Sequence, residues 1–153
     1  MRLWHVPVRL ATGAYILESG IKKWSSDDNE EMQKHVHSMA ASAYPQFASM
    51  DHRTFTKALA AGEITLGSAL LLPVVPAGWA GAGLAAFSGG LIGLYMRLPG
   101  MRQSGSIRPS SDGTALAKDS WLLAIAGALI VDAVTTRAGR AAASARAKLP
   151  GGG

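Results

Sequence analysis

The chain has no cysteine among its 153 residues, and it has only three phenylalanines and three tyrosines. The absence of cysteine excludes disulfide bonds, thiolate metal sites and dithiol redox chemistry. Glycine, by contrast, occurs 18 times. Few bulky aromatic rings and many small residues are more typical of closely packed membrane helices than of a soluble core.

Acidic residues are too few to balance the basic ones, and the formal net charge is +5. A basic chain can bind nucleic acid, but here Lys and Arg stand beside apolar blocks, as they do at the ends of membrane helices. We therefore expect membrane lipids as partners, and no nucleic acid. The length of 153 residues suits one domain, so we expect a single membrane domain over residues 1–153.

Four apolar blocks are long enough to cross a bilayer, which takes roughly 20 mostly apolar residues in a helix. They cover residues 3–21, 55–75, 77–95 and 116–134. The first block lacks a clean small-x-small cleavage site and is interrupted by Arg9 and Glu18, which favours a retained helix over a signal peptide. The third block has no charge and no polar face, which argues against a buried soluble hairpin bundle. We predict an all-α fold, a four-transmembrane-helix bundle.

The connections between the blocks agree with this count. The sequence PVVPAG between the second and third blocks predicts a tight turn between antiparallel neighbours. The next link is polar and rich in Gly, Pro and Ser, as a solvent loop is. Residues 135–153 form a basic tail, either a short helix on an anionic membrane surface or a solvated tail. The Lys and Arg count places the two long loops in the cytoplasm, whereas the basic tail argues for the reverse, so the orientation stays open.

The long link between the first two spans contains a predicted amphipathic helix. Asp28 and Glu31 fit a helix cap, and Pro45 would end the helix. Apolar residues recur on one helical face between these limits, at Met32, Val36, Met39 and Ala43. The helix either lies on the membrane or covers the bundle end as a solvated loop helix. In both cases we expect Met32, Val36 and Met39 to face a partner.

Ionisable residues inside the spans are the features closest to chemistry, because a charge in hydrocarbon is costly and normally faces a partner inside the bundle. Antiparallel threading places Glu18, Glu63, Lys118 and Asp119 at one membrane face, with Arg9 deeper. We predict one intramembrane polar cluster. It is either a site for a quinone headgroup, a proton relay or a lipid headgroup, or an ion-pair network that fixes helix register. The structural interpretation is the one we favour.

Other candidate sites are weak. His35, His37 and His52 lie in one loop, but residues two apart on a helix point in different directions, so we predict no metal site. His5 has no evident partner. The four tryptophans fall near proposed span ends, as interfacial anchors do: Trp4, Trp24, Trp79 and Trp121.

Three segments resemble the DoxX-like family of small four-helix membrane proteins. RLATGAYILESGIKKW is similar to the first helix of that family, AAGEITLGSALLLP to the second and ALAKDSWLLAIAGAL to the start of the fourth. The positions that match the family pattern are Arg9, Gly13, Glu18, Gly20, Lys23, Glu63, Lys118 and Asp119. The family is named for a subunit linked to thiosulfate:quinone oxidoreduction, so the resemblance implies a quinone as possible cofactor. This chain departs from any thiol-based scheme, and its long first loop fits the family loosely.

Two functions follow as hypotheses. The preferred one is a small accessory subunit, not catalytic on its own, that packs against other subunits of a larger envelope or respiratory complex in the plasma (inner) membrane. The small-residue face of the third span, at Gly89 and Gly90, would contact that partner. The alternative is a quinone-linked oxidoreductase subunit. A transporter is a distant third, because four helices without an evident repeat leave little room for alternating access.

Overall fold

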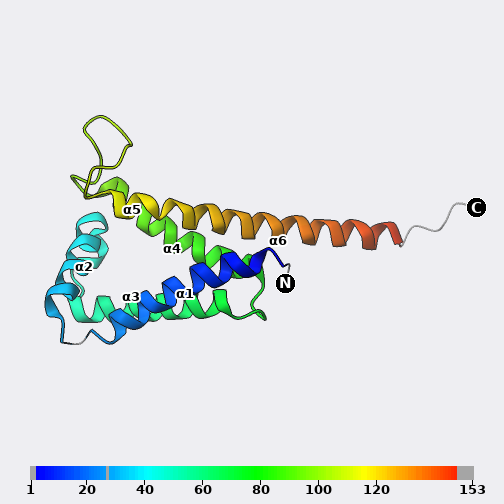
Figure 1. Ribbon diagram of the computed structural model, residues 1–153, viewed down its shortest axis with the longest axis horizontal. Helices are drawn as coiled ribbons and strands as arrows, with labels where there is room; N and C mark the ends of the chain where they lie inside the picture. Colours follow the sequence, from blue (N-terminus) through cyan, green and yellow to red (C-terminus); the bar gives the residue numbers. More distant parts are fainter. Residues whose placement is uncertain (1–2, 27, 148–153) are drawn as a thin grey trace, which may run out of the picture.

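The computed structural model describes residues 3–26 and 28–147, and this part of the chain is all-α, as predicted (Figure 1). The long helices are α1 (His5–Trp24), α3 (His52–Leu71), α4 (Ala77–Arg97) and α6 (Ser120–Ala147). The shorter ones are α2 (Glu30–Ala43), the 3-10 turn η1 (Pro45–Phe47) and α5 (Thr114–Lys118).

The long helices form two closely packed antiparallel pairs, α1 with α3 and α4 with α6 (Figure 1). Contacts between the pairs are sparser, including those between α3 and α4, which the tight turn joins. One apolar core nevertheless draws buried side chains from all four helices, among them Ile16, Leu70, Leu84, Leu122 and Leu129. The turn thus makes α3 and α4 antiparallel, as predicted, but each packs most closely against another helix.

Glycines set the close approach within each pair. A Cβ on Gly67 would lie 2.6 Å from the backbone nitrogen of Leu17, and a Cβ on Gly20 would lie 2.8 Å from that of Ile64. In the other pair, a Cβ on Gly81 would lie 3.1 Å from the Ala126 carbonyl oxygen. Larger residues there would push the helices apart, so backbone contact replaces side-chain interdigitation in these seams.

Two of the helices are long and apolar enough to cross a membrane. They are Ala77–Arg97 and the stretch Thr114–Ala147, which is α5 and α6 taken together. Only 22% and 17% of the residues in their apolar windows are buried inside the protein, so most of their apolar surface faces outward. The helices α1 and α3 have 20 residues each, but their charged residues lower their hydropathy.

The observed helix limits differ from the prediction in two places. The second span was expected to reach residue 75, but α3 ends at Leu71 because Pro73 follows closely. The fourth span was expected to be one helix over 116–134, but Asp119 separates α5 from α6. Residues 135–147 of the predicted basic tail continue α6 without a break to Ala147 and project beyond the other helices (Figure 1). Alanine, the best helix former, is frequent in this stretch. The remaining residues of the predicted tail, 148–153, lie outside the described residues.

The predicted helix in the first long link is present as α2, which lies across the end of the bundle against α3 and α4 (Figure 1). It ends at Ala43, ahead of Pro45, as predicted. Its N-cap is Asn29, whose side chain accepts a hydrogen bond from the Met32 amide at 3.0 Å, and not the predicted Asp28 with Glu31.

The face that α2 buries is more polar than its apolar periodicity indicated. The buried residues are Gln33, Ala40 and Ala43. The side-chain amide of Gln33 donates to the Ser26 carbonyl oxygen at 2.8 Å, which explains why a polar residue lies inside. The predicted partner-facing residues Met32, Val36 and Met39 lie beside this face and are half-buried.

Candidate functional site

An ion pair joins α1 to α3 near the end that α2 covers. The Lys23 ammonium lies 2.9 and 2.8 Å from the two carboxylate oxygens of Glu63, and it also donates to the Ser19 hydroxyl at 2.6 Å. The Glu63 side chain is only 5% exposed and that of Lys23 19%. A buried carboxylate needs such a partner, because the desolvation of an unpaired charge is costly.

The local sequence of α1 explains this geometry. Ser19 and Lys23 are four residues apart and therefore lie on one face of the helix. Gly20 lies on the same side, where a Cβ would come within 2.9 Å of the Glu63 Cβ. The glycine thus lets α3 approach closely enough for Lys23 to reach both oxygens of Glu63.

A small cavity of about 180 Å³ adjoins the pair and brings all four long helices to one place. Its polar lining comes from Lys23, Glu63, Ser19, Tyr15 and Asp119, and its apolar lining from Ile16, Phe87, Leu91 and Leu122. Asp119 enters from the break between α5 and α6. Its carboxylate makes no hydrogen bond or ion pair with the other described residues. The structure therefore places two carboxylates and one ammonium around a single cavity.

Only part of the predicted cluster is present here. Glu63 and Asp119 line the cavity, but Glu18 points outward and pairs with Lys22 at 2.6 Å, with an exposed fraction of 64%. Lys118 is also exposed, at the end of α5. The prediction that these four residues form one cluster is therefore wrong. It considered how far along each helix a residue lies, but not the direction in which its side chain points around the helix axis. Glu18 and Lys23 are five residues apart, about 140° around an α-helix.

Arg9 is not part of the cluster but lies at the opposite end of the bundle, with an exposed fraction of 2%. Its guanidinium donates hydrogen bonds of 2.8–3.1 Å to the carbonyl oxygens of Ala69, Leu70, Leu72 and Val75. The last carbonyls of a helix have no partner within it and carry its partial negative charge. Arg9 therefore caps the C-terminus of α3 from the neighbouring helix.

Two polar partners escaped the prediction. The sequence marks Lys23 only through its match to the family pattern, although its spacing from Ser19 and Gly20 on one helical face is a usable signal. The sequence indicates no partner for His5, but His5 is buried and its Nε2 lies 3.1 Å from an Asp132 carboxylate oxygen, across α1 and α6. No sequence spacing shows that second pairing.

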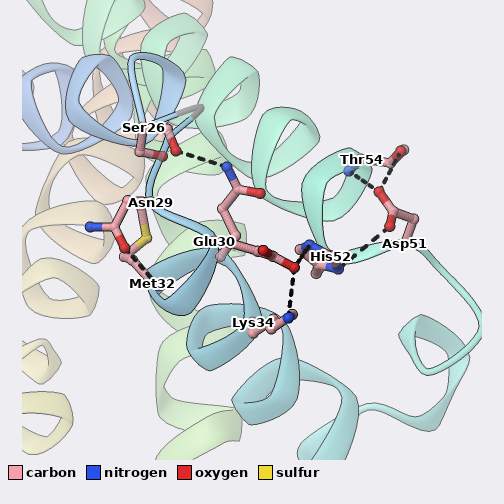
Figure 2. Close-up of polar contacts among 9 residues, drawn as sticks. Ser26, Asn29, Glu30, Met32, Lys34, Asp51, His52 and Thr54 are labelled. Atoms are coloured by element: carbon pink, nitrogen blue, oxygen red, sulfur yellow. Dashed lines mark hydrogen bonds and ion pairs between the residues drawn. The ribbon is translucent and has the colours of Figure 1, made fainter.

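The polar contacts at the start of α2 are structural (Figure 2). His52 Nε2 lies 3.8 Å from a Glu30 carboxylate oxygen, and His52 Nδ1 lies 3.5 Å from one of Asp51. The Lys34 side chain hydrogen-bonds Glu30 and lowers the pKa of that carboxyl. Among the described residues, no three His, Cys, Asp or Glu side chains are arranged to hold a metal ion.

The predicted partner-facing glycines are on the surface of α4. A Cβ on Gly89 or Gly90 would meet nothing within 4 Å, so this stretch is open. The carbonyl of Gly90 accepts a hydrogen bond from the Tyr44 hydroxyl at 2.9 Å, which ties the end of α2 to α4. Met39 lines a groove with Leu98 and other residues after α4.

No family model matches the chain, and no curated protein or solved structure matches it either. The resemblance to the DoxX-like family stays a prediction.

Proposed function

We propose that the chain is a four-span integral membrane protein of the plasma (inner) membrane and serves as an accessory subunit of a larger envelope or respiratory complex. The observation that carries the proposal is that some helical glycines pack against a neighbouring helix, whereas others have no atoms of the protein beside them. Gly13, Gly20, Gly67 and Gly81 each face a neighbouring helix, with atoms within 3.1 Å of the Cβ position. On α4, Gly89 and Gly90 are equally small but face open space. Small residues let membrane helices approach one another, so this stretch fits a helix of another subunit.

The charges of α1 and α3 do not prevent these helices from spanning. Arg9, Lys23 and Glu63 point inward and are hydrogen-bonded within the bundle. A charge with partners inside the bundle is compatible with a membrane span. Twenty residues of helix measure about 30 Å, the thickness of the hydrocarbon core. These features support four spans in place of the two that hydropathy selects.

Exposed tryptophans near both bundle ends also support spanning. Trp4 and Trp79 are exposed beside the starts of α1 and α4. Trp24 and Trp121 are also exposed, and they belong to the last turn of α1 and the first turn of α6. These two helix ends lie at the other end of the bundle (Figure 1). Tryptophans at both ends of a helical bundle are typical of helices that cross a bilayer.

The test is purification of the tagged full chain from native membranes in mild detergent, with mass spectrometry of what accompanies it. Gly89→Leu should abolish co-purification of a stoichiometric partner, because a large side chain would fill the open stretch of α4. Gly127→Leu is the matched control, since Gly127 is also exposed and open but lies on α6 with no second glycine beside it, outside the proposed contact. Circular dichroism should show the same helix content in both variants. Recovery of the wild-type chain alone, or an equal yield of partner with both variants, would contradict the proposal.

The alternative function, a quinone-linked oxidoreductase subunit, has one observation in its favour: the cavity beside Lys23, Glu63 and Asp119 combines polar and apolar lining. Its volume of about 180 Å³ is below the roughly 300–1,000 Å³ that small-molecule sites usually occupy. This size favours the accessory function. Lipid extraction of gently purified protein tests the alternative: quinone should be present and should decrease in Glu63→Gln but not in Glu18→Gln. Absence of quinone from the wild-type protein would rule the alternative out.

A further inference from the structure

A groove of about 350 Å³ lies at the end of the bundle opposite the Glu63 cavity. It is bounded by the first turn of α1, the turn between α3 and α4, the start of α4 and the middle of α6. Its lining includes His5, Gly78, Asp132, Thr136, Arg137 and Arg140. None of these residues lines the Glu63 cavity.

The charge around the groove is mainly positive. Arg137 and Arg140 are exposed on one face of α6, three residues apart, and the buried Arg9 lines the groove from α1. Asp132 is the carboxylate among the lining residues, and His5 Nε2 lies 3.1 Å from one of its oxygens. Two exposed guanidinium groups therefore face a groove whose carboxylate already lies beside a histidine.

The groove also contains buried polar atoms without hydrogen bonds. His5 is 3% exposed and its Nδ1 has no hydrogen-bond partner, while Nε2 is close to Asp132 but not in hydrogen-bond geometry. The Thr136 hydroxyl oxygen is likewise buried and without a partner. Buried polar groups are nearly always hydrogen-bonded, so unsatisfied ones that line a groove indicate a missing partner.

The start of α4 adds hydrogen-bond donors. This helix begins after Pro76 with no side-chain cap, and the groove reaches Ala77 and Gly78 in its first turn. The first amides of a helix are unpaired within it and carry partial positive charge, which suits an anion. A helix N-terminus, two guanidinium groups, a buried imidazole and a hydroxyl together match the acceptor oxygens of a phosphate group.

We propose that this groove binds a phosphate group, supplied by an anionic lipid headgroup or by free phosphate. Trp4 and Trp79 are exposed near the same bundle end, so the groove lies at the depth where lipid headgroups would be. Arg137 and Arg140 donate hydrogen bonds to two of the phosphate oxygens. The first amides of α4 and the Thr136 hydroxyl donate to the other phosphate oxygens. The extension of α6 beyond the bundle keeps both arginines on an ordered helix.

The test uses the full chain in non-ionic detergent and native mass spectrometry with two lipids of identical tails, phosphatidic acid and diacylglycerol. Phosphatidic acid should be retained and diacylglycerol should not. Arg137→Gln should weaken retention by about tenfold, the loss expected when one charge-assisted hydrogen bond is removed. Arg146→Gln is the matched control, because Arg146 is exposed on α6 outside the groove.

Thr136→Val provides a second variant that keeps the shape of the side chain. Because the Thr136 hydroxyl has no partner in the unliganded protein, this change should weaken lipid retention without lowering the thermal stability of lipid-free protein. Inorganic phosphate is then added as a competitor. Displacement of the lipid at millimolar phosphate identifies free phosphate as the source, and resistance identifies the headgroup. Equal retention of the two lipids, or equal losses in Arg137→Gln and Arg146→Gln, would overturn the proposal.

Discussion

At the scale of single residues, the buried charges act by joining helices. Arg9 closes the C-terminus of α3 from α1, and Lys23 joins α1 to Glu63 of α3 near the other end of the same pair. Both contacts supply hydrogen-bond partners to polar groups that the packing of α1 against α3 removes from water. We therefore expect the α1–α3 pair to depend on these two contacts more than on any exposed ion pair.

Arg9→Met should destabilise the protein by about 3 kcal/mol, because one buried carbonyl, that of Leu70, and three partly buried carbonyls then lose a hydrogen bond, and an unsatisfied buried group costs about 1–3 kcal/mol. Arg9→Lys should be intermediate, since an ammonium has three donors and lacks the planar fork of the guanidinium. Chemical unfolding in detergent measures both changes. Arg146→Met, on the exposed end of α6, is the control and should have no effect. Wild-type stability in Arg9→Met would refute the capping role.

The Lys23–Glu63 pair should behave as a strongly coupled unit. Lys23→Met or Glu63→Met alone leaves a buried charge without its partner and should cost about 3–5 kcal/mol. The double variant should recover much of that loss, because two apolar side chains replace the pair. A double-mutant cycle by unfolding in detergent measures the coupling. Purely additive single losses would show that the pair does not act in this way, and Glu18→Gln, on the exposed pair, should change nothing measurable.

At the scale of elements, the region around α2 depends on helix caps. Asp51 caps α3 by accepting a hydrogen bond from the Thr54 amide at 3.1 Å (Figure 2). This hydrogen bond lowers the pKa of the Asp51 carboxyl. Asn29 caps α2 in the same manner, but its amide does not titrate. Acid should therefore weaken the cap of α3 and leave the cap of α2 unchanged.

The sign of the pH effect follows from the lowered pKa of Asp51. A carboxyl whose pKa is lower in the folded than in the unfolded protein stabilises the fold above its unfolded pKa, about 3.9, and loses this contribution as the pH falls through the folded pKa. Asp51→Asn keeps an accepting cap without titration, so its thermal stability should fall less below about pH 4. The comparison is made in a Glu30→Gln background, because the pKa of Glu30 is also lowered. The same acid sensitivity with and without Asp51 would contradict this assignment.

At the scale of the whole molecule, the property to test is whether both helix pairs cross the membrane or only α4 and α5–α6 do. The natural absence of cysteine makes each introduced cysteine a unique label. Four spans place Leu3→Cys and Val74→Cys on one side of the membrane and Ser25→Cys and Ser104→Cys on the other. If only α4 and α5–α6 crossed, Ser25→Cys would react from the same side as Val74→Cys. Labelling of intact cells with a membrane-impermeant maleimide distinguishes the two arrangements.

The sequence by itself determined the features that depend on local pattern. Apolar blocks between Pro- and Gly-rich links located the four long helices, PVVPAG made α3 and α4 antiparallel, and Pro45 marked the end of α2. These features follow from backbone chemistry and hydropathy along the chain, which need no knowledge of distant contacts.

Only the tertiary structure decided which polar groups meet. The position of a residue along a helix can be counted from the sequence. What its side chain meets depends on which helix lies beside it, and the sequence does not show this. In the structure, α1 pairs with α3 and α4 pairs with α6. That pairing turns Glu63 toward Lys23 and leaves Glu18 outside. It also brings Arg9 to carbonyls some sixty residues away. Backbone carbonyls are present at every position, so no pattern in the sequence marks those that a distant arginine will cap.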